Sequence, residues 1–128
     1  MKILRCLMHA FGVLALITAG QTVAQSYPTG PVRMIVPFPP GGGVDGMGRI
    51  VSQKLSEILG RTFPIENRSG ANGNIGTEAA AKAPKDGYTL LFTGAGLVTN
   101  PSLYAKVPYD PVKDFDPISL VSIAPNVL

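Results

Sequence analysis

Two residue types that carry much of protein chemistry are nearly missing from this chain, which has one cysteine and one histidine in 128 residues. Both, Cys6 and His9, lie in an N-terminal segment that is expected to be removed. Within the other residues, this excludes disulfide scaffolds, zinc sites with cysteine or histidine ligands, thiol nucleophiles and histidine bases. Most common hydrolytic mechanisms are excluded with them, and we expect no metal and no cofactor.

An excess of charge of one sign is also missing. The sequence has 11 basic and 8 acidic residues, a formal net charge of +3. Without Lys2 and Arg5, which belong to the same N-terminal segment, nine basic residues face eight acidic ones and the net charge is near +1. This balance does not favour nucleic acid or an anionic membrane surface as a partner.

Long apolar runs are absent apart from one short run near the N-terminus. Residues 10–19 form an apolar core of about ten residues behind a short basic region. Small residues at 22–24 follow, and residues 24–26 offer a second candidate cleavage site. This layout is typical of a secretory signal peptide over residues 1–24, so we expect export. A membrane anchor is the alternative, but the run is shorter than the roughly twenty residues that cross a bilayer.

Apolar periodicity in residues 25–128 predicts an α/β domain in which strands alternate with helices. A first helix is expected over residues 45–59, and Gly60 is suited to end it. Alternation implies a parallel sheet with helices on both faces and ligands at the carboxyl ends of the strands. The other expected elements are strands over 32–36, 62–66, 88–92 and 118–123, a helix over 75–82 and a helical turn over 100–104.

The most informative stretch is the junction between the first strand and the first helix, Pro37-Phe38-Pro39-Pro40-Gly41-Gly42-Gly43. Such a junction leaves backbone N–H groups without intrahelical partners near the positive end of the helix dipole. Carboxylates and phosphates bind there without any cationic side chain. A second small-residue bend at 93–96 also follows a strand, so we expect two bends to converge on a pocket lined by backbone amides.

Simpler roles remain open for several of these residues. The three glycines at 41–43 could serve only to let the helix pack closely on the sheet. Asp45 is interpreted as a helix N-cap, because an acidic side chain facing an anionic ligand is unfavourable. Asn67 and Arg68 are interpreted as a turn and a surface or inter-loop contact. Arg33 either pairs with an acidic residue or is exposed.

The same junction also fits a dinucleotide-binding pattern. Gly41, Gly43 and Gly46 have the required spacing, and Glu66 follows about twenty residues later, where a ribose-binding acid is expected. Three features count against dinucleotide binding. Two prolines stiffen a bend that dinucleotide-binding folds keep tight, and the chain is expected to be exported, whereas nicotinamide cofactors are mostly cytoplasmic. Glu66 also leads into another glycine-rich loop and not into a plain helix. A phosphate-loop nucleotide site is disfavoured further, because no Gly-Lys-Ser/Thr sequence follows the bend.

Four blocks in order carry a family resemblance. They are Tyr27-Pro28 through Val36-Pro37-Phe38-Pro39-Pro40-Gly41-Gly42-Gly43-Val44-Asp45, Glu66-Asn67-Arg68-Ser69-Gly70-Ala71-Asn72-Gly73-Asn74-Ile75-Gly76, Ala83-Pro84-Lys85-Asp86-Gly87-Tyr88-Thr89-Leu90-Leu91-Phe92, and Asn100-Pro101-Ser102-Leu103-Tyr104 with the following Tyr109 to Ile118. Together they resemble the substrate-binding receptors of tripartite tricarboxylate transporters, the Bug family of periplasmic solute-binding proteins.

The resemblance implies a two-lobed receptor of the periplasmic binding protein type II class, with residues 25–128 as the first α/β lobe. It implies a monomeric, non-catalytic periplasmic protein that binds a small carboxylate through backbone amides and delivers it to a membrane permease. By position, the implied ligand contacts are Phe38, Pro40, Gly41, Gly42, Gly43, Asn74, Thr93, Gly94, Ala95 and Gly96.

This chain departs from the family pattern in two ways. Gly46 and Gly48 lie in the first turns of the first helix, where each glycine costs roughly 0.5–1 kcal/mol relative to alanine. The chain is also about half as long as a family member, which suggests an N-terminal fragment or a truncated gene product. Two other hypotheses stay open: an exported carboxylate-acting enzyme using Ser69, Asp45 or Glu66, and a fragment that binds nothing.

Overall fold

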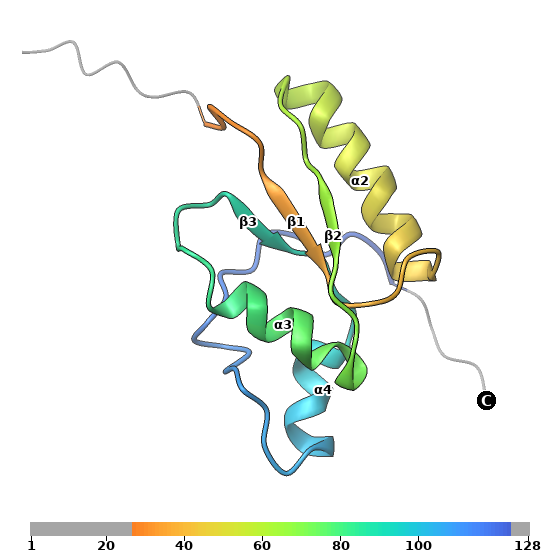
Figure 1. Ribbon diagram of the computed structural model, residues 1–128, viewed down its shortest axis with the longest axis vertical. Coiled ribbons are helices and arrows are strands. Elements are labelled where there is room, and N and C mark those ends of the chain that lie inside the picture. Colours follow the sequence, from red (N-terminus) through yellow and green to blue (C-terminus); the bar gives the residue numbers. More distant parts are fainter. Residues whose placement is uncertain (1–26, 124–128) are drawn as a thin grey trace, which may run out of the picture.

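The computed structural model describes residues 27–123, so the predicted signal peptide lies outside the described residues. Strands and helices alternate around a small parallel sheet, as predicted (Figure 1). Along the described part of the chain, no helix is both long enough and apolar enough to cross a membrane. The elements are β1 (Arg33–Val36), α2 (Gly43–Leu59), β2 (Ile65–Asn67), η1 (Ala71–Gly73), α3 (Asn74–Ala81), β3 (Thr89–Leu91) and α4 (Gly96–Leu103).

The sheet has the strand order β2-β1-β3, and both pairs are parallel. The step from β1 to β2 and the step from β2 to β3 therefore run in opposite directions across the sheet. Because parallel crossovers are right-handed, α2 and α3 must lie on opposite faces. Accordingly, α2 packs on β1 and β2, while α3 packs on β1 and β3 (Figure 1).

The central strand is buried because both of its faces are covered. Val32, Met34, Ile35 and Val36 are each at most 2% exposed, and Phe63 and Tyr109 complete the apolar core. A continuous apolar run of this kind is what a strand between two helical layers requires. The strand predicted over residues 32–36 is therefore confirmed as β1, and it is the central strand of the sheet.

Helix α2 starts earlier than expected and ends as expected. It begins at Gly43, with Gly42 as its N-cap, so the prediction of Asp45 as the N-cap is wrong. Asp45 occupies the third helical position instead, and its carboxylate reaches back to the preceding bend. At the other end Gly60 adopts φ 64° and its N–H donates to the Ser56 carbonyl, which is the predicted glycine stop.

Residues 118–123 do not form the predicted fourth strand, and they pair with no strand among residues 27–123. Ile118, Leu120 and Ile123 are 80%, 75% and 80% exposed. Apolar sequence gives a strand only where a sheet edge is available to satisfy its backbone groups. The short strand β3 pairs with β1, and residues 118–123 do not pair with the other edge of β3.

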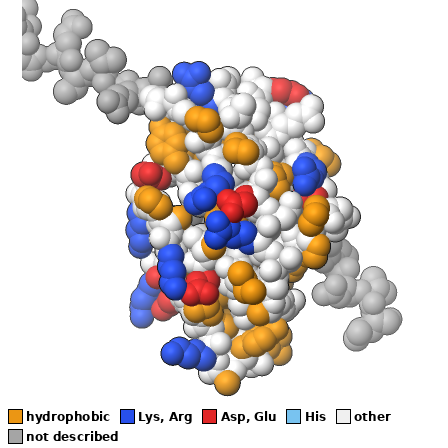
Figure 2. All heavy atoms as spheres, in the orientation of Figure 1, with side chains coloured by type: hydrophobic (Ala, Val, Ile, Leu, Met, Phe, Trp, Pro, Cys, Tyr) orange, Lys and Arg blue, Asp and Glu red, His pale blue; other side chains and the backbone are white. Residues whose placement is uncertain are grey.

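Charged and polar side chains on one face of the sheet link β2, β1 and β3. Glu66 pairs with both Arg33 and Arg68, and Arg33 also donates to the Thr89 hydroxyl. Arg33 is thus paired with an acidic residue, and the exposed Arg68 makes a surface contact, which was one of the roles expected for it. Acidic and basic side chains lie next to one another on the face drawn in Figure 2.

Candidate functional site

The candidate site lies where β1 and β3 end side by side. These strands are adjacent in the sheet, yet the chain leaves them toward helices on opposite sides. In open α/β sheets such a switch point is where ligands bind. The bend over residues 37–42 follows β1 and the bend over residues 92–95 follows β3, so both predicted bends meet at this edge.

The first bend presents open backbone. Within residues 27–123, the N–H groups of Gly42, Gly43, Val44 and Asp45 have no hydrogen-bond acceptor, and no side chain caps the helix. Gly41, Gly42 and Gly43 are exposed. Unpaired N–H groups at a helix N-terminus are suited to bind an anion.

Close packing does not explain these three glycines. A Cβ on Gly41 or Gly43 would meet no atom within 4 Å, and one on Gly42 would meet only the Pro39 carbonyl oxygen at 3.5 Å. Gly41 needs to be glycine because its φ is +85°. The close approach of α2 to the sheet occurs instead at Gly48, whose Cβ would lie 3.3 Å from both Phe92 and Val36.

The second bend has the same character. In the described part of the chain, no acceptor pairs with the N–H groups of Thr93, Gly94, Ala95 and Gly96. The carbonyls of Gly94 and Ala95 accept bonds from Leu97, Val98 and Thr99, which turn the chain into α4. The predicted turn at 100–104 is thus the second half of a helix that starts at Gly96.

The turn η1 packs against the first bend and against the start of α4. A Cβ on Gly73 would lie 3.5 Å from both the Phe38 ring and Pro37, and one on Gly96 would lie 3.5 Å from the Asn72 carbonyl oxygen. The next glycine is tighter still: a Cβ on Gly76 would come within 2.8 Å of Pro37. Glycine at the end of η1 and in the first turn of α3 therefore lets α3 approach the first bend closely.

Asn74 belongs to a buried polar cluster. Its side-chain oxygen accepts hydrogen bonds from Asn100 at 2.7 Å and from the Tyr109 hydroxyl at 3.0 Å. Asn72 and Asn100 also bond each other through two contacts. Any contact of Asn74 with a ligand would therefore come from its side-chain nitrogen. The fourth sequence block contains Asn100 and Tyr109, but the sequence alone assigned no role to either side chain, because their partners are distant along the chain.

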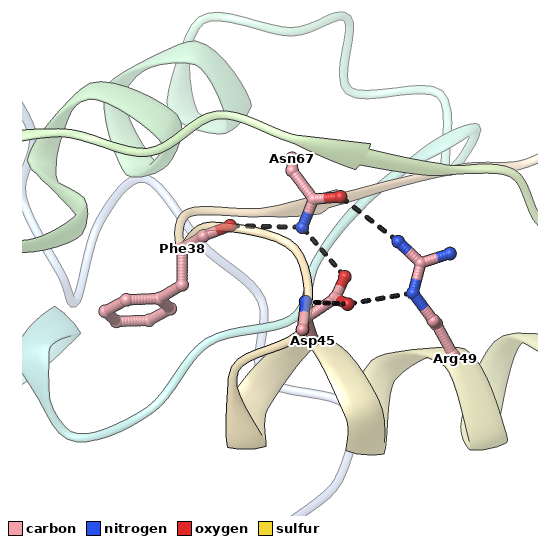
Figure 3. A network of polar contacts seen from close by, with 5 residues as sticks. Phe38, Asp45, Arg49 and Asn67 are labelled. Carbon is pink, nitrogen blue, oxygen red and sulfur yellow. Dashed lines mark hydrogen bonds and ion pairs between the residues drawn. The ribbon is translucent and has the colours of Figure 1, made fainter.

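A second polar network surrounds Asp45, which is 1% exposed (Figure 3). Its Oδ2 accepts from the Gly41 N–H at 2.9 Å and from Arg49 Nε at 2.8 Å. Its Oδ1 accepts from Asn67 Nδ2 at 2.8 Å, and the same amide donates to the Phe38 carbonyl at 3.0 Å. The Arg49 guanidinium, with these two further donors, holds the pKa of the Asp45 carboxyl well below its usual range.

Other chemistries find less support at this edge. Glu66, the acid required by the dinucleotide reading, is held by Arg33 and Arg68. Among residues 27–123, no three His, Cys, Asp or Glu side chains gather in a way that would hold a metal ion. The chemistry that the site offers is hydrogen-bond donation from the main chain.

Comparison with known proteins identifies the family. The family model described as "Tripartite tricarboxylate transporter family receptor" matches residues 47–128. The chain is 45% identical over 112 residues to the protein BugT of Bordetella pertussis. The match covers 86% of this chain and 34% of BugT. It is 42% identical over 120 residues to a protein of Pseudomonas sp. strain P51, with 91% of this chain and 36% of that protein covered.

Solved structures agree with this. The periplasmic binding protein BugD superposes with a TM-score of 0.69 at 44% identity, covering 72% of this chain and 31% of BugD. The protein MatC of Rhodopseudomonas palustris, solved with bound malate, superposes with a TM-score of 0.65 at 34% identity. The match covers 74% of this chain and 33% of MatC. The protein Rpa4515 of R. palustris, solved with adipate, superposes with a TM-score of 0.65 at 43% identity. The match covers 66% of this chain and 29% of Rpa4515.

The chain spans about a third of the length of the relatives it matches. Its α/β fold corresponds to part of a periplasmic binding protein, and the resemblance predicted from four sequence blocks is confirmed. The chain belongs to the Bug family, the receptors of tripartite tricarboxylate transporters.

Proposed function

We propose that this chain forms the first lobe of a periplasmic receptor that binds a small carboxylate and delivers it to a membrane permease. The observation that supports the proposal is that two sets of unpaired N–H groups follow the ends of the neighbouring strands β1 and β3. Oriented N–H groups stabilise a carboxylate without a cationic side chain. Family membership supports a receptor rather than an enzyme.

The proposed ligand is a di- or tricarboxylate. The related proteins MatC and Rpa4515 were solved with malate and adipate, which are both dicarboxylates. Main-chain donors recognise the carboxylate group and leave the rest of the ligand to other contacts. The proposed contacts in this lobe are Phe38, Pro40, Gly41, Gly42, Gly43, Asn74, Thr93, Gly94, Ala95 and Gly96.

Transport requires that the bound state differ from the free state. A second lobe closing over the ligand would provide that difference, and the permease would recognise the closed form. We expect export by a cleaved signal peptide, and we therefore propose that binding occurs in the periplasm.

The decisive variant is Gly42→Leu in the complete mature protein. Gly42 has φ −76°, and a Cβ there makes only an ordinary contact with the Pro39 carbonyl oxygen, so we expect the fold to tolerate the substitution. The added side chain would cover the neighbouring N–H groups. We expect thermal-shift measurements to show that malate and adipate stabilise the parent and not Gly42→Leu.

Gly30→Leu is the matched control. Gly30 precedes β1, at the opposite edge of the sheet, and a Cβ there meets no atom within 4 Å. This variant should keep the full ligand-induced shift. An equal shift in Gly42→Leu would remove the first bend from the site.

The two remaining hypotheses predict different results. Chemical conversion of malate or adipate, followed by NMR, would indicate an exported enzyme. Absence of binding to residues 25–128 by calorimetry, alongside binding by the complete mature protein, would show that this lobe alone is insufficient.

A further inference from the structure

The first bend is fastened at both of its ends. At one end, Asn67 Nδ2 donates to the Phe38 carbonyl at 3.0 Å, and at the other, Asp45 Oδ2 accepts from the Gly41 N–H at 2.9 Å. A third bond, from Asn67 Nδ2 to Asp45 Oδ1 at 2.8 Å, joins the two fasteners. The bend is thus tied to α2 and to the end of β2 through two side chains (Figure 3).

The two residues between these two hydrogen bonds have a rigid backbone and cannot donate a main-chain hydrogen bond. Pro39 and Pro40 have fixed φ angles and no N–H group. The N–H of Gly41 is used by Asp45. After the two prolines, the first main-chain donor available to a ligand is therefore that of Gly42, and its position depends on how the preceding residues are held.

The charge of the fastening carboxylate is compensated locally. An acidic group beside an anion site would repel the ligand if it stood alone. Arg49 Nε lies 2.8 Å from Asp45 Oδ2, and that carboxylate is 2% exposed while the Arg49 side chain is 57% exposed. The pair lets a buried carboxylate position the bend without leaving a net negative charge next to the ligand.

We propose that the side chain of Asp45, acting with Asn67, has a positioning role and sets carboxylate affinity without its carboxylate touching the ligand. This inference rests on the proposed binding function. Its physical basis is preorganisation: a bend already held in its binding shape loses less conformational freedom when the ligand binds. The Asp45 carboxylate thus does not have the N-cap role expected from the sequence, and its hydrogen bonds go to the bend, to Arg49 and to Asn67.

Asp45→Asn tests the role with little change in size. The amide keeps one acceptor oxygen but places an NH₂ group against a donor, from either Asn67 or the Gly41 and Arg49 side. At least one fastener is lost. We expect calorimetry to give a Kd for malate or adipate about tenfold or more weaker than in the parent. Asn67→Ala should weaken binding similarly, and the double variant should be weaker by less than the product of the two effects.

Asp110→Asn provides the matched control. Asp110 also accepts backbone N–H bonds, from Val112 and Lys113, and pairs with the Lys113 side chain, but it lies outside both bends. This variant should lose thermal stability and keep the parent Kd. A purely structural role for Asp45 predicts the same outcome for Asp45→Asn, and that result would overturn the proposal.

Amide hydrogen exchange separates this proposal from the proposed function. In the ligand-free protein, we expect the Gly41 amide to be protected in the parent and unprotected in Asp45→Asn. If neither malate nor adipate binds the parent but this difference is found, the positioning of the bend stands and the ligand assignment fails. If the Gly41 amide exchanges freely in the parent, the positioning role itself is wrong.

Discussion

At the scale of single residues, the chain uses buried polar side chains to hold irregular backbone. Asp45 holds Gly41, and Asn74 accepts from Asn100 and Tyr109, so the turns around the site are fixed by side chains. Within residues 27–123, every fully buried side-chain nitrogen or oxygen has a hydrogen-bond partner. Buried polar groups that are satisfied in this way specify one arrangement, because breaking a single bond leaves a costly unpaired group.

The pH dependence of stability should report the Asp45 contacts. The pKa of Asp45 is lowered in the folded state, chiefly by Arg49 and then by the Gly41 N–H and Asn67. A lowered folded pKa stabilises the protein above the ordinary aspartate value of about 3.9, and this contribution is lost as the pH falls below it. Urea unfolding of the parent should therefore show a declining free energy of unfolding below about pH 4.

Asp45→Asn should decline less steeply over the same range, because this group no longer takes up a proton. Asp110→Asn should have a separate effect, since backbone N–H bonds from Val112 and Lys113 lower the pKa of Asp110 as well. If the free energy of unfolding fell equally steeply with pH in the parent and in Asp45→Asn, the Asp45 carboxylate would not be held as described.

At the scale of elements, the glycines of α2 have opposite roles. Gly46 is exposed within the helix and a Cβ there meets no atom within 4 Å. Gly48 is buried, and its Cβ would lie 3.3 Å from Phe92 and Val36 and 3.7 Å from Ile65. The sequence indicated that both weaken the helix, but one of them is the contact point between α2 and the sheet.

Substitution should separate the two. Gly46→Ala should raise the free energy of unfolding by about 0.5–1 kcal/mol, because alanine has less backbone freedom to lose. Gly48→Val should lower it by about 1–3 kcal/mol, because the added methyl groups overpack the contact with the sheet. Urea titration monitored by circular dichroism measures both, and a gain in stability at Gly48 would contradict the observed packing.

At the scale of the whole molecule, the described lobe leaves apolar side chains uncovered. On α2 these include Met47, Ile50 and Ile58, and beyond α4 they include residues of the extended segment 118–123. Figure 2 shows apolar side chains exposed in small groups over the drawn face, between charged side chains. Exposed apolar surface of this kind favours association.

We expect residues 25–128, produced alone, to associate as their concentration rises, in contrast to the monomer expected for the complete receptor. Sedimentation velocity should detect this. Replacing Ile118, Leu120 and Ile123 together with serine should reduce the association, because these side chains are more than 70% exposed and make no contact that the fold requires. A monomer at all concentrations would contradict the prediction.

The sequence by itself determined the order of the elements, the central strand, the glycine stop of α2 and the two small-residue bends. These follow from local pattern: apolar period, glycine conformational freedom and the restrictions of proline. The same local rules misplaced the start of α2, gave α4 too few residues and proposed a strand at 118–123.

Only the tertiary structure decided which bends become neighbours and what each polar side chain does. Strand order placed the two bends side by side, and the contact of Asp45 with Asn67 joins residues 22 positions apart. Asn74 meets Tyr109 across 35 positions. A strand at 118–123 needed a sheet edge that a single sequence cannot show. Partners brought together by folding leave no periodic mark on the chain, so their roles become visible only in three dimensions.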